Sequence, residues 1–193
     1  MARKKYEFQP DKQGAGFFSK LYLTRKQRLS LLRWFLYALV LLVLSVVQDV
    51  ILCKMDVFGA TTELFPCAIL LICIYLGTES GSVFCLIAAA AYGFSGTAPG
   101  YYDIALITAL GIGTAMFRQS YLRKSAGSDM VCAGIAFLLY KLIHFLIGFV
   151  FEMVPLGKIG VFLLGAALSG LLIPALYPII AVIDRIGGET WKE

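Results

Sequence analysis

The sequence predicts an all-α, polytopic membrane protein: a bundle of six transmembrane helices with the N- and C-termini both cytoplasmic. Of the 193 residues, 60% are hydrophobic and only 15% are charged, whereas a soluble domain carries about 25% charged residues. The charges gather before Ser30, between Arg118 and Asp129, and after Ile183. The stretches between these blocks are apolar over lengths that cross a bilayer. We therefore expect a single membrane domain.

Basic side chains decide the predicted orientation. Residues 1–30 carry lysine or arginine at eight positions, namely Arg3, Lys4, Lys5, Lys12, Lys20, Arg25, Lys26 and Arg28. The positive-inside rule places this segment in the cytoplasm, either as a flexible tail or as a short amphipathic helix on the membrane surface. The transmembrane domain then covers 31–184, and 185–193 form a short cytoplasmic tail.

The net charge of +5 does not indicate nucleic-acid binding. The basic residues flank apolar spans, where positive charge fixes topology, and contact with anionic lipid is a secondary role open to them. The five cysteines form no CxxC pair, and zinc sites need paired ligands at short spacing. We therefore predict no metal and no cofactor, and we interpret the cysteines as small apolar packing residues.

The first span is predicted over 31–53, with Trp34 near its inner end, where aromatic rings favour the interface. The second and third spans, 64–76 and 82–94, are short. Gly77, Thr78, Glu79, Ser80 and Gly81 form a brief inner turn between them.

The stretch 88–118 organises the rest of the chain. It is the end of one apolar helix, a tight turn, and a second apolar helix closed by an arginine. Glycine and proline this dense reverse the chain, and the turn is built from Gly93, Ser95, Gly96, Pro99 and Gly100. The fourth span follows at 102–117, and the loop after it is basic. Four crossings bring the chain back inside there, so charge and span count agree.

The last two spans are predicted over 130–151 and 159–183. Two prolines within the sixth span are expected to kink it. The fifth span carries Lys141 and His144, which lie three residues apart on one helix face. A charged group near the middle of a span costs about 2.5–3.5 kcal/mol on insertion scales, so it should face the protein interior or water.

The expected partners of Lys141 are Tyr140, Asp49 and Asp103. One interpretation of this set is a polar pocket for a ligand or for the helix of a partner. The other is an internal lock between helices, or a lysine that snorkels to the interface. No GxSxG, HExxH, P-loop or DxD pattern occurs, so we predict no enzyme activity.

Small residues form a second candidate set. In a membrane they let helix backbones approach closely, because lipid supplies no hydrophobic drive for helix association. They can serve either a partner helix or internal packing, and both interpretations stay open for Ala88, Ala91, Gly111, Gly113, Ala115, Gly165 and Gly170.

Over nearly its whole length the chain resembles the rod shape-determining MreD family of membrane proteins. The resemblance rests on the order and spacing of several stretches: VVQDVIL at 46–52, Pro66 after a short loop, the turn GFSGTAPG, GIGTAMFRQSYLRKS at 111–125, and LYPIIAVIDRI at 176–186. The chain departs from the family pattern at Tyr92, where members often carry an aspartate, and at Ala88, which replaces a glycine.

The resemblance implies a non-catalytic part of the bacterial cell-elongation machinery in the inner membrane. Its partner would be a bitopic protein of the MreC type. Through that partner, RodA and its transpeptidase would be coupled to MreB filaments, so that peptidoglycan synthesis is linked to the filaments and cell shape is controlled.

The family fold is similar to the substrate-binding subunits of energy-coupling-factor vitamin transporters, which gives an alternative function. Such subunits usually carry an alanine-spaced motif on the first span. Here only Ala38 is small before Ser45, which favours the scaffold.

Overall fold

The computed structural model describes residues 25–54, 60, 62–95, 100–122, 125–151 and 154–187. Five long helices follow one another along the chain: α1 (Arg25–Val50), α2 (Leu64–Phe94), α3 (Tyr102–Tyr121), α4 (Ala126–Val150) and α5 (Ile159–Gly187). Two short 3-10 helices, η2 (Leu52–Lys54) and η3 (Leu156–Lys158), follow α1 and precede α5. No β-strand lies among the described residues, so the predicted all-α class is confirmed.

Four of these helices are long and apolar enough to cross a membrane. They are α1 from Arg28 onward, α2, α4 and α5. The helix α3 is not among them, and it carries Asp103 in its first turn and Arg118 in its last. The chain is therefore a multi-helix membrane protein, but the described residues supply four helices that can cross a membrane and not the predicted six.

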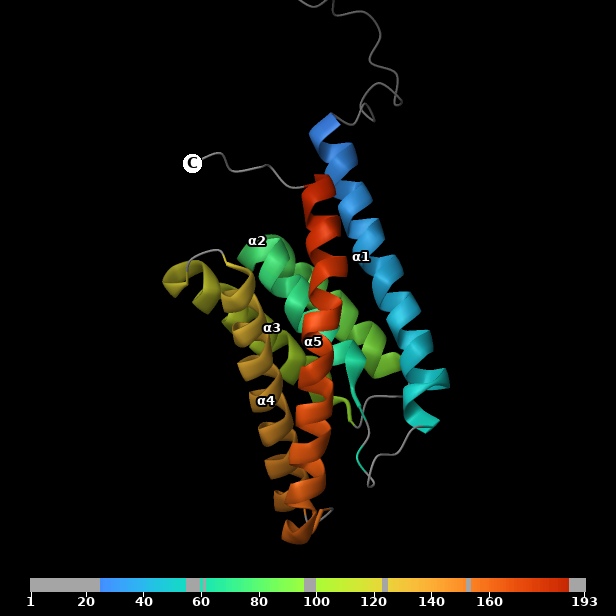
Figure 1. The fold of residues 1–193 in the computed structure, drawn as a ribbon, viewed down its shortest axis with the longest axis vertical. Helices are drawn as coiled ribbons and strands as arrows, with labels where there is room; N and C mark the ends of the chain where they lie inside the picture. The colour runs from blue at the N-terminus through green and yellow to red at the C-terminus, as the bar shows by residue number, and fades with distance from the viewer. Residues whose placement is uncertain are drawn as a thin grey trace, which may run out of the picture.

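The predicted second and third spans are the two halves of one element, α2, which is sharply kinked at Gly77 (φ 79°, ψ 179°). Only glycine adopts this left-handed φ at little cost. The second half folds back alongside the first, as Figure 1 shows in green. A Cβ atom at Gly81 would lie 2.7 Å from the carbonyl oxygen of Cys73, so a second glycine allows the halves to pack closely.

The first half of α2 forms the centre of the bundle. All its residues from Leu64 to Ile74 are buried, and α2 contacts each of the other four long helices. The sequence explains this position, since LFPCAILLICI is apolar around the whole helix circumference and such a helix needs packing partners on every side. The described cysteines of the core, Cys67, Cys73, Cys85 and Cys132, are buried free thiols, as expected for packing residues.

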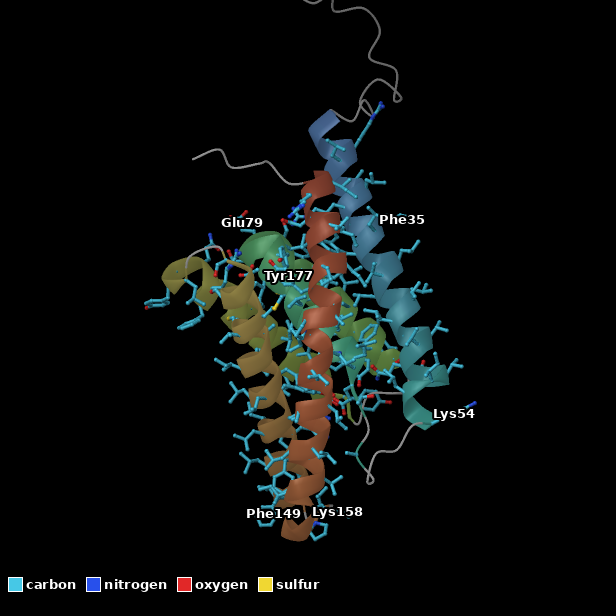
Figure 2. All side chains as sticks on the ribbon, viewed as in Figure 1. Phe35, Lys54, Glu79, Phe149, Lys158 and Tyr177 are labelled. Carbon is cyan, nitrogen blue, oxygen red and sulfur yellow. The ribbon has the colours of Figure 1, made fainter. Side chains whose placement is uncertain are left out.

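The outer faces of the bundle are apolar. Large hydrophobic side chains on α1, α4 and α5 are exposed, including Phe35, Leu142 and Leu171, and Phe35 points away from the bundle (Figure 2). A soluble monomer rarely exposes a contiguous apolar surface of this kind. The described surface therefore fits contact with lipid.

The start of α1 and the end of α5 lie at the same end of the bundle (Figure 1). We call this the terminal end and the opposite one the distal end. Of the predicted basic segment, residues 1–24 lie outside the described residues, as do 188–193 of the tail, whereas 25–30 already belong to α1. The helix α5 continues through both of its prolines.

The predicted turn lies between α2 and α3. The hydroxyl of Ser95 donates a hydrogen bond to the backbone oxygen of Tyr92 at the end of α2, and Gly100 lies two residues before the start of α3. Gly93 belongs to the last helical turn of α2 and not to the loop. A Cβ atom there would lie 2.7 Å from the side chain of Ile104 on α3, so the glycine allows close packing of the two helices. Gly96 and Pro99 lie outside the described residues.

Candidate functional site

Two groups of polar side chains interrupt the apolar bundle. The distal polar cluster consists of Glu63, Asp103, Tyr140, Lys141 and His144. The terminal-end cavity is lined by side chains of all five helices. Four of the five residues in the first group are predicted site residues, whereas Ala115 is the one predicted site residue in the described lining of the cavity.

Asp103 is the centre of one half of the distal polar cluster. Its side chain is completely buried in the first turn of α3, where Oδ2 accepts a hydrogen bond from the backbone N–H of Gly100 at 3.1 Å. Its Oδ1 accepts from the hydroxyl of Tyr140 at 3.3 Å and lies 3.3 Å from Nδ1 of His144. The hydroxyl of Tyr102 lies 3.2 Å from the same nitrogen. The structure thus brings together Asp103, Tyr140 and His144.

Lys141 forms the other half of the cluster. Its Nζ lies 2.5 Å from Oε1 of Glu63, the residue that precedes α2. It also lies 6.0 Å from the ring centroids of Phe137 and Phe162. Asp49, a predicted partner, instead lies exposed near the end of α1. Glu63 was absent from the predicted set, because its position before a short span gave no sign of how deep in the bundle it lies.

Hydrogen bonds tie this cluster to α1 and α5. The backbone N–H of Glu63 donates to Oγ of Ser169 on α5 at 2.9 Å. The buried side chain of Gln48 at the end of α1 accepts from the backbone N–H of Phe65 at 2.8 Å. The two polar residues in VVQDVIL therefore have different roles: Gln48 caps the start of α2, whereas Asp49 is exposed. One oxygen of Glu63, Oε2, is buried with no hydrogen-bond partner among the described residues.

The side chains of the distal cluster form ion pairs and hydrogen bonds between helices. Lysine and glutamate, and histidine and aspartate, satisfy each other as acid–base pairs across α2, α3 and α4. Removing only one partner of a buried ion pair of this kind destabilises the protein, because the other charge stays buried without compensation. Within the described ranges, no group of histidine, cysteine, aspartate and glutamate side chains could hold a metal ion.

The terminal-end cavity has a volume of about 770 Å³. Two arginine–aspartate pairs stand on its wall. Arg118 of α3 donates from Nε and Nη2 to the two carboxylate oxygens of Asp129 on α4, at 2.8 and 3.1 Å. Arg33 of α1 pairs with Asp184 of α5 and also donates to the backbone oxygen of Tyr75, at 3.1 Å.

The remaining wall of the cavity is aromatic and polar. The rings of Tyr75 and Tyr177 lie 5.9 Å apart, inclined at 55°. The second half of α2 begins at the cavity, and Thr78 donates from its hydroxyl to the side-chain oxygen of Gln119 at 2.9 Å. Sequence reasoning missed this site because its lining comes from five separate segments. The available signal was the position of single charged residues at the edges of the apolar runs.

The small residues separate into an internal and an external set. Ala88, Gly111, Ala115 and Gly165 are buried, and a Cβ atom at Gly111 would lie 2.5 Å from Sγ of Cys85. Gly113 and Gly170 instead have open space beside them, and Ala91 is exposed.

Two apolar grooves run along the outer faces of the bundle. The first lies between α3 and α4, passes Gly113 and has a volume of about 610 Å³. The second lies between α1 and α2, includes Ala88 and Ala91, and measures about 360 Å³.

Tyr92 stands where proteins of the MreD family often carry an aspartate, and it has a packing role in this chain. Its side chain is buried and stacks on Phe65, with ring centroids 5.1 Å apart and planes inclined at 17°. An aspartate at this position would replace the stacked pair with a buried carboxylate.

A comparison with known protein families, curated proteins and solved structures finds no match to this chain.

Proposed function

We propose that this protein is a non-catalytic membrane scaffold of the bacterial cell-elongation complex. It binds the transmembrane helix of a bitopic MreC-type protein and, through that partner, helps couple peptidoglycan synthesis by RodA and its transpeptidase to MreB filaments. The observation that carries the proposal is the apolar groove between α3 and α4, where Gly113 leaves open space on the outer face. The resemblance to the MreD family supplies the identity of the partner.

The groove suits a helix better than it suits a small polar ligand. Its lining is almost wholly apolar, and each wall combines small residues with large hydrophobic ones: glycine, alanine and threonine with leucine and phenylalanine on α3, and glycine, serine, cysteine and alanine with valine, isoleucine and leucine on α4. The hydroxyl of Thr114 already donates to the backbone oxygen of Leu110, at 2.7 Å. Small side chains on one wall allow a neighbouring helix backbone to approach closely.

The proposed topology has six passes. The two halves of α2 each make a short pass and α3 makes another, between the full crossings of α1, α4 and α5. Six passes return the chain to the side from which it began, which agrees with the position of both helix ends at the terminal end. The lysines and arginines before and after the spans support a cytoplasmic location for that end in the proposed topology.

The distal polar cluster acts in this proposal as a lock between helices. Lys141 and Asp103 each face a partner side chain inside the bundle. The cluster holds α2, α3 and α4 in register, and the outer face of α3 and α4 stays rigid for a partner.

The test is copurification from a rod-shaped bacterium in mild detergent. We expect an MreC-type protein to be recovered with the wild-type chain and lost with Gly113→Leu, which fills the groove. The matched control is Gly170→Leu, since Gly170 on α5 also has open space beside it but lies outside the groove. Equal recovery of the MreC-type protein with both variants would contradict the proposal that the α3–α4 groove binds the partner helix. Recovery of an ATPase-coupled membrane subunit or a bound vitamin would instead support the transporter alternative.

A further inference from the structure

The terminal-end cavity lies where the bundle changes from apolar to polar. Arg33 stands in the early turns of α1, Arg118 in the last turn of α3, Asp129 in the first turn of α4, and Asp184 near the end of α5. Charged residues at the ends of apolar helices mark the level of lipid headgroups. The cavity volume of about 770 Å³ is within the range of sites that hold small molecules.

Among the described residues, the charges on the cavity wall do not balance. Two arginines and three acidic residues line it, and each arginine is paired with one aspartate. The surplus negative charge belongs to Glu79, which is exposed and has no ion pair with any described residue. Within the described part of the chain, the wall therefore presents one carboxylate without an ion pair, which could accept a cationic group.

Aromatic faces stand on the same wall. Tyr75 and Tyr177 form an inclined pair, and Figure 2 shows Tyr177 and Glu79 in the part of the bundle near the terminal end. Tyrosine faces attract alkylammonium groups through their negative π-surface. The two paired arginines retain N–H donors beyond those that the aspartates accept, because a guanidinium carries five. These donors suit a phosphate oxygen.

We propose that the terminal-end cavity binds a phospholipid headgroup that ends in a primary ammonium. The ammonium lies between Glu79 and the tyrosine pair, and the phosphodiester lies toward Arg33 and Arg118. A purely anionic headgroup would meet the free carboxylate without a compensating cation. This site is independent of the α3–α4 groove and of the proposed partner.

The test is lipid binding to the detergent-solubilised full chain, measured by native mass spectrometry with phosphatidylethanolamine and phosphatidylglycerol of identical acyl chains. We expect phosphatidylethanolamine to bind more tightly. Non-specific attraction to a chain of net charge +5 would favour phosphatidylglycerol, so this order cannot come from bulk charge.

Three variants sharpen the test. Glu79→Gln should weaken phosphatidylethanolamine binding about threefold to fivefold, as expected for an exposed ion pair, and Glu79→Lys should reverse the preference of the two lipids. The control is Asp49→Asn, which removes an exposed carboxylate near the distal end of α1 and should change neither. Tighter binding of phosphatidylglycerol to the wild-type chain, or equal effects of Glu79→Gln and Asp49→Asn, would overturn the proposal.

Discussion

The distal polar cluster and the terminal-end cavity use similar side chains for opposite purposes. The distal cluster consists of two side-chain pairs inside the bundle: Lys141 with Glu63, and His144 with Asp103. In the terminal-end cavity Arg33 and Arg118 pair with aspartates on the wall of an open volume. The first arrangement fixes helices to one another, whereas the second leaves polar groups accessible from the end of the bundle.

Paired charges in a membrane protein therefore do not by themselves mark a ligand site. Accessible volume and an unpaired charge separate the two regions. If the contrast holds, substitutions in the distal cluster change stability, and substitutions around the cavity change binding.

The largest effect is expected for Lys141→Ala. It leaves the Glu63 carboxylate buried without its cation, which should lower the free energy of unfolding by about 3–5 kcal/mol. Thermal unfolding in detergent measures this loss. The double variant Lys141→Met with Glu63→Gln should recover part of it, because no uncompensated charge remains. A wild-type melting temperature in Lys141→Ala would show that the pair is not a lock.

Gly111→Val should also destabilise the fold strongly. A Cβ atom at this position would lie 2.5 Å from Sγ of Cys85, and overpacking of a core costs about 1–3 kcal/mol. Gly113→Val, two residues along the same helix, has open space beside it and should unfold like the wild type. Similar losses in both variants would mean that the two glycines do not differ in environment.

Tyr140→Phe tests one hydrogen bond of the distal cluster. It removes the donor to Asp103 while keeping the ring, so the expected loss is about 1 kcal/mol. The control is Tyr102→Phe, since Tyr102 is exposed and its hydroxyl contacts only His144 among the described side chains. Unfolding in denaturant should show a smaller loss of free energy of unfolding for the control. A larger loss for Tyr102→Phe than for Tyr140→Phe would contradict a stabilising role of the Tyr140–Asp103 hydrogen bond.

The smallest effect on stability is expected for Glu79→Gln. The residue is exposed and has no ion pair with a described residue to lose, so the free energy of unfolding should change by less than about 0.5 kcal/mol. Calorimetry in detergent without added lipid measures this change. A marked loss of stability would indicate a structural role for Glu79. The cavity, like the distal cluster, would then serve to hold helices together.

The sequence predicted much of the fold, because hydrophobic runs and glycine-rich turns are local signals. The helices α4 and α5 begin or end within a few residues of the predicted spans, and the predicted inner turn falls on the kink at Gly77. The crossing count was less predictable. The half-helices of α2 are each too short to distinguish a crossing from a buried helix, and only the packed structure shows the first half at the centre.

The candidate sites were predictable only where one helix carries them. The spacing of Lys141 and His144 is a helical signal, and it placed both on the face that the structure buries or half-buries. The partner Glu63 depends on where α2 lies relative to α4, which no local pattern reports. Gly111 and Gly113 differ by about 200° around α3, so one faces Cys85 and the other the groove, but the sequence does not say which.

The most direct test of the proposed scaffold is a photo-cross-linking residue placed at position 113 in living rod-shaped cells. We predict a cross-link to the transmembrane helix of an MreC-type protein at position 113 and none at position 170. Cross-links to the same protein at both positions, or at neither, would contradict the assignment of the α3–α4 groove as the partner site.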